Sequence, residues 1–156
     1  MLKRTLIGMA LCAGAASVSA SNIDSFPYAV GIQGADGLSF KAQMSPDLAA
    51  QLIVDPFGSY NRVIARGILD IEQGTYWKGY GYADGGVHLG ENDGTAGADT
   101  LGIGIGAGLG LQYDIRGLAV ELPPVAVSFD VGGGAIFYNN DAPFGLHYSL
   151  GLHYHF

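Results

Sequence analysis

The sequence has little charge and almost no cysteine. Its one cysteine, Cys12, lies within the first twenty residues, so the rest of the chain can form neither a disulfide nor a thiol site. Charged residues make up 13% of the chain, whereas soluble domains average about 25%. Acidic residues outnumber basic ones by fourteen to seven, which argues against nucleic-acid binding. No apolar run approaches the roughly 20 residues that a transmembrane helix needs.

The first residues have the pattern of a secretory signal peptide. Lys3-Arg4 is a short basic start, residues 5–16 form an apolar run too short to span a bilayer, and residues 18–20 form a small-residue cleavage site. No stop-transfer segment follows. We therefore expect a signal peptide at 1–20, cleaved after Ala20, and one β-barrel domain at 21–156.

Turn signals divide the remaining chain into eight runs in which large apolar residues alternate with small or polar ones. This two-residue period predicts strands with two unlike faces. In one run the proline pair Pro123-Pro124 removes two backbone donors, so we expect a bulge or a break there. The eight predicted strands are 26–35, 38–44, 48–54, 61–72, 76–89, 100–113, 118–131 and 146–156.

An even number of apolar-faced strands behind a signal peptide predicts the fold class: an all-β, eight-stranded antiparallel up-and-down transmembrane β-barrel of the outer membrane. Only helices and closed barrels satisfy every backbone group in lipid. Outer-membrane barrels have short inner turns and longer outer loops. The predicted inner turns are 45–47, 72–75 and 114–117, and the two longest outer loops are 90–99 and 132–143.

Aromatic residues near the predicted strand ends suggest two girdles at the membrane surfaces. The inner girdle would contain Tyr28, Trp77, Tyr113, Tyr154 and Phe156. The outer girdle would contain Phe40, Phe57, Tyr60, Phe129 and Phe144.

The interior of the predicted barrel should be a filled, polar core. Eight strands leave a lumen just wide enough for side chains to fill, and buried charges must be paired. A structural plug and a polar path for ions or a small solute both fit such a lining. Inward glycines at 102–110 either leave space for Tyr80 and Tyr82 or permit strong curvature. The predicted network contains four basic and four acidic residues: Lys41, Arg62, Arg66, Lys78, Asp70, Glu72, Asp84 and Glu121.

Three histidines near the C-terminus could carry chemistry. His147, His153 and His155 point to one side of a strand, but they lack convincing further ligands for a metal. His147 and Ser149 form a His-x-Ser pair like that of outer-membrane lipid A deacylases, with Glu121 as the only acid to enlist. A triad needs a base held by an orienting group. We predict no catalytic residue, no metal and no cofactor.

The chain resembles small outer-membrane barrels of the OmpA/OmpX-like transmembrane class, through its signal peptide, its amphipathic strands and its terminal Leu152, Tyr154 and Phe156. The stretch GADGLSFKAQMSPDLAAQL at 34–52 also resembles the first hairpins of a family of short outer-membrane barrels. The resemblance implies that the barrel-assembly machinery reads the three terminal residues as an assembly signal. It implies a location and a fold, and no activity.

Three functions remain open on the sequence. The preferred one is a non-enzymatic, monomeric outer-membrane barrel with a structural or surface-interaction role, whose partners are outer-membrane lipid, lipopolysaccharide and the assembly machinery. The second is a soluble, lipocalin-like periplasmic binder of an apolar ligand, which would need charged outward faces. The third is a lipid-modifying outer-membrane enzyme that uses His147 and Ser149.

Fractionation of cells that produce the protein separates the first two functions. The mature chain is expected to sediment with membranes and to require detergent for extraction, because its strands have too little charge for a soluble surface. Recovery in the aqueous fraction without detergent would refute the membrane prediction.

Overall fold

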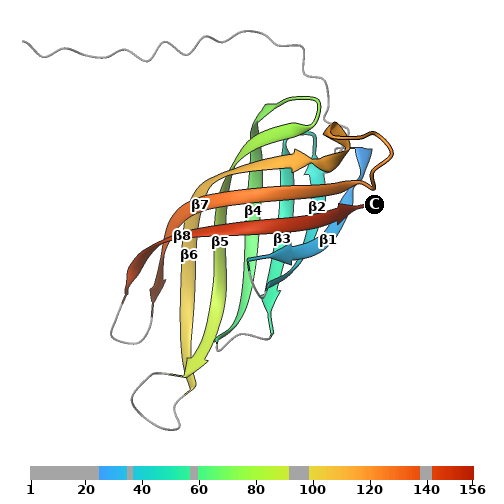
Figure 1. Cartoon of the computed structure of the whole chain (residues 1–156). Helices are drawn as coiled ribbons and strands as arrows, with labels where there is room; N and C mark the ends of the chain where they lie inside the picture. The colour runs from blue at the N-terminus through green and yellow to red at the C-terminus, as the bar shows by residue number, and fades with distance from the viewer. Residues whose placement is uncertain (1–24, 35–36, 57–59, 92–98, 138–141) are drawn as a thin grey trace, which may run out of the picture.

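The computed structural model describes residues 25–34, 37–56, 60–91, 99–137 and 142–156. In this part of the chain eight antiparallel strands form a closed barrel in sequence order, and the last strand pairs with the first (Figure 1). The predicted all-β, eight-stranded up-and-down barrel is confirmed. None of the described helices is long and apolar enough to cross a membrane. The strands are β1 (Tyr28–Gln33), β2 (Gly37–Ser45), β3 (Leu48–Asp55), β4 (Tyr60–Gln73), β5 (Trp77–Glu91), β6 (Asp99–Asp114), β7 (Val125–Phe137) and β8 (Phe144–His155).

The register places apolar residues beside apolar residues around the wall. Val30 of β1, for example, pairs with Phe40 of β2 on one side and with Tyr154 of β8 on the other, and all three are exposed. Lys41 pairs with Gln51 of β3, and both are buried. Directly paired residues point to the same side of a sheet, so the predicted alternation becomes an apolar outside and a polar inside.

The interior of the barrel is mainly polar. Among the described residues the cluster of buried hydrophobic side chains is small and contains Ala49, Ile68, Tyr80 and Tyr82. Buried polar groups need hydrogen-bond partners, so the core is held by specific bonds more than by apolar packing. The buried polar and charged residues are Gln33, Ser39, Lys41, Gln51, Asp55, Arg66, Lys78, Gln112, Asp114, Ser128, Asp130, His153 and His155.

Tyrosines of β5 fill the space that glycines of β6 leave open. A Cβ atom added to Gly108 would lie 2.5 Å from the hydroxyl of Tyr82, closer than real Cβ contacts allow. A Cβ atom on Gly110 would overlap the ring of Tyr80. The sequence allowed two roles for these glycines, to leave space for tyrosine side chains or to permit strong curvature of the strand. The packing shows that they leave space for the tyrosines.

The seventh strand begins later and ends later than predicted. Residues 118–124 lie outside the sheet, and β7 starts at Val125, directly after the proline pair that cannot donate to a ladder. The short 3₁₀ helix η2 (Ile115–Gly117) occupies the start of this connection, and the Arg116 amide donates to Asp114 Oδ1 over 3.0 Å. At its far end β7 extends to Phe137, into the predicted outer loop 132–143. The predicted contrast between short inner turns and long outer loops is therefore weaker than expected.

The wall of the barrel has unequal height. The strands β1, β2 and β3 have 6, 9 and 8 residues, whereas β4 to β8 have 12 to 16. In Figure 1 the long strands continue past the blue β1 toward the end opposite the C-terminus. One side of the barrel is consequently lower than the other at that end.

Replacement of Gly110 by alanine tests the fit between glycine and tyrosine. Gly110→Ala forces a methyl group against Tyr80 and is expected to lower the free energy of unfolding by about 1–3 kcal/mol, the usual cost of overpacking. Gly67→Ala is the matched control, since the nearest atom to its added Cβ is 4.0 Å away, and a change within about 0.5 kcal/mol is expected. Urea unfolding curves of the two variants measure the difference. Equal stabilities would contradict the packing.

Candidate functional site

Arg66 of β4 is the centre of the barrel interior. Its Nη1 donates to Asp130 Oδ2 of β7 over 2.6 Å, and its Nη2 donates to Asp84 Oδ2 of β5 over 2.9 Å. The side chains of Arg66 and Asp130 are 6% and 0% exposed. The guanidinium also lies 3.9 Å from the centroid of the Tyr82 ring. One buried cation therefore ties three strands across the lumen through charge-assisted hydrogen bonds.

Asp130 collects hydrogen bonds from several strands. The Tyr80 hydroxyl donates to its Oδ1. The Gln33 side chain of β1 donates to Oδ2 over 3.0 Å, and the Ser149 hydroxyl of β8 donates to the same oxygen over 3.4 Å. We name these residues together with Arg66 and Asp84 the Arg66–Asp130 network. It joins five of the eight strands and closes the lumen at this level.

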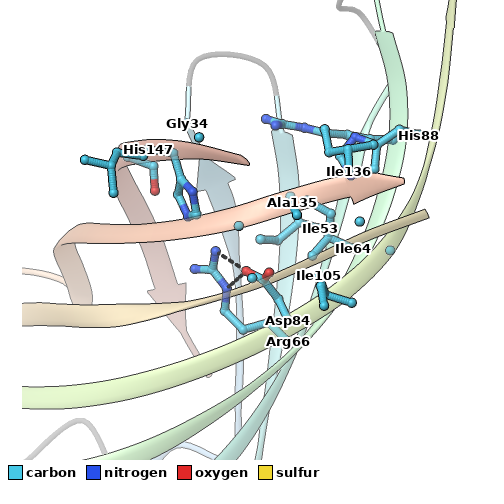
Figure 2. Close-up of a pocket in the computed structure, with 18 of the residues that line it drawn as sticks. Gly34, Ile53, Ile64, Arg66, Asp84, His88, Ile105, Ala135, Ile136 and His147 are labelled. Carbon is cyan, nitrogen blue, oxygen red and sulfur yellow. Dashed lines mark hydrogen bonds and ion pairs between the residues drawn. The ribbon is translucent and has the colours of Figure 1, made fainter. Parts of the chain in front are cut away.

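A cavity of about 510 Å³ lies above this network, toward the end opposite the C-terminus (Figure 2). The network side chains Gln33, Arg66, Asp84 and Ser149 supply polar lining, and three inward isoleucines supply apolar lining. The volume falls within the range of about 300–1,000 Å³ that small-molecule sites occupy. The three isoleucines are Ile53, Ile64 and Ile136. The lining also includes Arg62, His88, His147, Phe144, Leu146 and Tyr148.

The space exists because small and apolar residues occupy inward positions at one level of the wall. Ile64 pairs with Gly86, Gly86 with Gly104, and Gly104 with Ile136, so these residues form a row across four strands. The two glycines place no side chain in the lumen, and the His88 ring lies over Gly104, where an added Cβ would be 2.5 Å from His88 Nε2. Ile64 is an apolar residue at an inward position between Arg62 and Arg66, and it lines the cavity.

A second, much smaller cavity of about 20 Å³ lies at the C-terminal end of the barrel. It is lined by Lys41, Lys78, Gln112 and His155, among others, and it shares no lining residue with the larger cavity. Lys78 pairs with Asp70 over 2.8 Å, and Lys41 donates to Gln112 over 3.2 Å. The two cavities are thus separate in the part of the chain that the structure describes.

Six of the eight residues predicted for the interior network line the lumen, and two do not. Lys41, Arg66 and Lys78 are buried, and Arg62, Asp70 and Asp84 have inward ion-pair partners.

The prediction that Glu72 and Glu121 belong to the interior network is wrong. A β-bulge between Asp70 and Glu72 shifts the register so that Glu72 pairs with Gly79 on the outward face. Glu121 is exposed in the connection before β7, because that strand begins only at Val125.

Three aspartates that the prediction left out replace those glutamates. Asp55 pairs with Arg62 over 2.9 Å, Asp114 pairs with Arg116 over 2.7 Å, and Asp130 pairs with Arg66. The lumen and its ends therefore contain five basic and five acidic side chains among the described residues. The inward parity of Asp130, between outward Phe129 and Val131, was the signal that could have identified it.

The candidate catalytic pair does not form a triad. The Nε2 atom of His147 lies 2.9 Å from the Tyr82 hydroxyl, and Ser149 accepts from Gln33 over 2.6 Å, so each has another partner. Glu121, exposed in the connection before β7, belongs to the end of the barrel where the C-terminus lies.

The remaining histidines have separate surroundings. His153 lies 2.9 Å from the Ser39 hydroxyl, and His155 lines the small cavity. Among the described residues no group of three His, Cys, Asp or Glu side chains is placed to hold a metal ion.

Comparison with protein-family models, with curated proteins and with solved structures finds no match for the chain. The functional argument therefore comes from the geometry alone.

Neutralising Asp130 tests whether the network holds the barrel together. Asp130→Asn leaves Arg66 without one of its two buried counter-charges, and the free energy of unfolding is expected to fall by about 3 kcal/mol. Glu72→Gln makes the same chemical change at an exposed position and should alter it by less than about 0.5 kcal/mol. Denaturant unfolding followed by circular dichroism compares the two variants. A loss for Asp130→Asn no larger than that for Glu72→Gln would show that the network does not stabilise the fold.

Proposed function

We propose that the protein is an integral outer-membrane barrel of the small OmpA/OmpX-like class, with a closed lumen and a structural or surface-interaction role that involves no catalysis. The observation that carries the proposal is the outward face of the wall. Large apolar side chains are exposed on all eight strands. Monomeric soluble proteins rarely expose a contiguous apolar patch above a few hundred Å², whereas a barrel in lipid requires such a band.

The polar outward positions lie near the ends of the wall. Asn61 is next to the first residue of β4, and Glu72 is next to the last. The outward residues of β6 and β8 between their ends are aliphatic or aromatic. A soluble lipocalin-like binder would need charges on these faces, so the distribution supports the membrane proposal over that alternative.

Aromatic residues gather at the C-terminal end of the wall. Trp77 pairs with Tyr113, and the Tyr28 ring lies 6.1 Å from the Phe156 ring. Phe40, which we had assigned to the outer girdle, stacks on Tyr28 at 6.0 Å and belongs to this end instead. Phe57 and the side chain of Tyr60 lie outside the described residues. A ring of aromatic side chains at one rim is the usual arrangement at a membrane interface.

The C-terminal residues complete the barrel seam. The Phe156 amide donates to the Tyr28 carbonyl over 2.9 Å, and the Tyr28 amide donates back over 3.3 Å. Leu152 and Tyr154 pair with Ile32 and Val30 on the outward face. The three terminal residues therefore form one apolar row on the strand that pairs with β1 at the seam, which supports their proposed role as the signal for the assembly machinery.

The closed lumen predicts a protein that does not conduct ions. After reconstitution in planar bilayers, the protein is expected to give no steady conductance steps, because the Arg66–Asp130 network separates the two cavities. Co-flotation with vesicles and a β-rich circular dichroism spectrum establish in parallel that the protein has inserted. Steady channels from inserted protein would overturn the closed lumen, and failure to float with vesicles would overturn the membrane proposal.

A further inference from the structure

The barrel wall has a gap between β1 and β8 beside the large cavity. Pairing of these strands runs from Ala29↔His155 to Gln33↔Gly151, and the last bond joins the Gly34 amide to the Leu150 carbonyl over 2.7 Å. On its other side β8 stays paired with β7 as far as Phe144. Within the described residues, the β1-facing edge of 144–149 has no strand beside it.

The free edge presents backbone hydrogen-bonding groups to the gap. Alternate residues of an antiparallel strand bond to the same neighbour. Because Phe156 and Leu150 bond to β1, the amide and carbonyl groups of Tyr148 and Leu146 face the same side. Hydrocarbon alone cannot satisfy these groups. An occupant of the gap therefore has to offer polar atoms at this edge.

The cavity reaches the outside of the wall through this gap. Its lining contains the inward residues His147 and Ser149 together with the outward residues Leu146 and Tyr148. In β8 this mixture falls on residues 146–149, whose β1-facing edge has no strand beside it among the described residues. Leu146 and Tyr148 are 84% and 80% exposed, the largest values among the exposed large hydrophobic residues.

Beside the two edge carbonyls, the gap offers one cationic side chain and two backbone donors. The Nε atom of Arg62 donates to Asp55 Oδ2 over 2.9 Å, and Arg62 lines the cavity. Its Nη2 lies 4.0 Å from the point where a Cβ on Gly34 would be, which places it at the margin of the gap. The guanidinium of Arg62 and two edge amides that have no partner among the described residues suit a phosphate, whose oxygens accept several hydrogen bonds.

We propose that the gap binds an anionic phospholipid of the surrounding membrane, an inference that rests on the proposed membrane location. The phosphate lies between the Arg62 guanidinium and the edge amides of Leu146 and Tyr148. The acyl chains lie on the outward face of β8, against Phe144, Leu146 and Tyr148. The cavity gives the headgroup room, with polar lining from the Arg66–Asp130 network and His147.

A tryptophan reporter at the gap tests the proposal in vesicles. Tyr148→Trp, in a Trp77→Phe background, is reconstituted in phosphatidylcholine vesicles that contain either brominated phosphatidylglycerol or brominated phosphatidylcholine at the same mole fraction. Quenching by the brominated anionic lipid is expected to be stronger by up to about fivefold, the preference that one partly exposed ion pair gives. Leu152→Trp, on the paired part of β8, should be quenched equally by both lipids.

Paired neutral substitutions identify the group responsible. Asp55→Asn/Arg62→Gln removes the charge at the gap without leaving Asp55 buried and unpaired, and it should abolish the preference. Asp114→Asn/Arg116→Gln makes the same change at the other end of the barrel and should preserve it.

The outcomes separate the two proposals. Equal quenching of Tyr148→Trp by both lipids would overturn the lipid site while leaving the membrane location intact, since quenching still occurs. A preference that survives the change at Arg62 would also overturn the site. Absence of quenching at both reporter positions would overturn the membrane location and the site with it.

Discussion

Charged side chains buried in the narrow lumen must be paired, and this requirement governs how the strands are held together. A ring of eight strands encloses only enough space for side chains. A cation buried there without a counter-charge would strongly destabilise the folded state. Arg66 is placed between Asp84 and Asp130, and Asp130 in turn accepts from Tyr80, Gln33 and Ser149. Strands far apart in the sequence are thereby held in one register.

The inward polarity of the barrel has its counterpart in the outward apolar face. With ionised groups concentrated inside and at the rims, the wall exposes aliphatic and aromatic residues from Tyr28 to Phe156. The chain needs few charged residues because they are concentrated in the core and at the rims, and the outward face has almost none. The same division explains why the interior contains only a small apolar cluster, around Tyr80 and Tyr82.

Unequal strand lengths make one end of the barrel different from the other. At the C-terminal end tyrosines cover glycines and the lumen is packed, with only a small cavity remaining. At the opposite end β1 stops while β8 continues, and Ile64, Gly86, Gly104 and Ile136 leave a cavity behind the uncovered edge. Among the described residues, the packed end and the larger cavity beside the uncovered β8 edge therefore lie at opposite ends of one small fold.

The residue pattern alone predicts the eight strands, the sides to which their residues point and six of the lumen charges, because a two-residue period is a local property. It missed the start of β7, since Leu118, Val120 and Leu122 keep the alternation although they lie outside the sheet. It also assigned Glu72 and Glu121 to the lumen in place of Asp55, Asp114 and Asp130. Those partners, the tyrosine–glycine packing and the gap at β8 could not be predicted from the pattern, because each depends on the register between strands and on where a neighbouring strand ends.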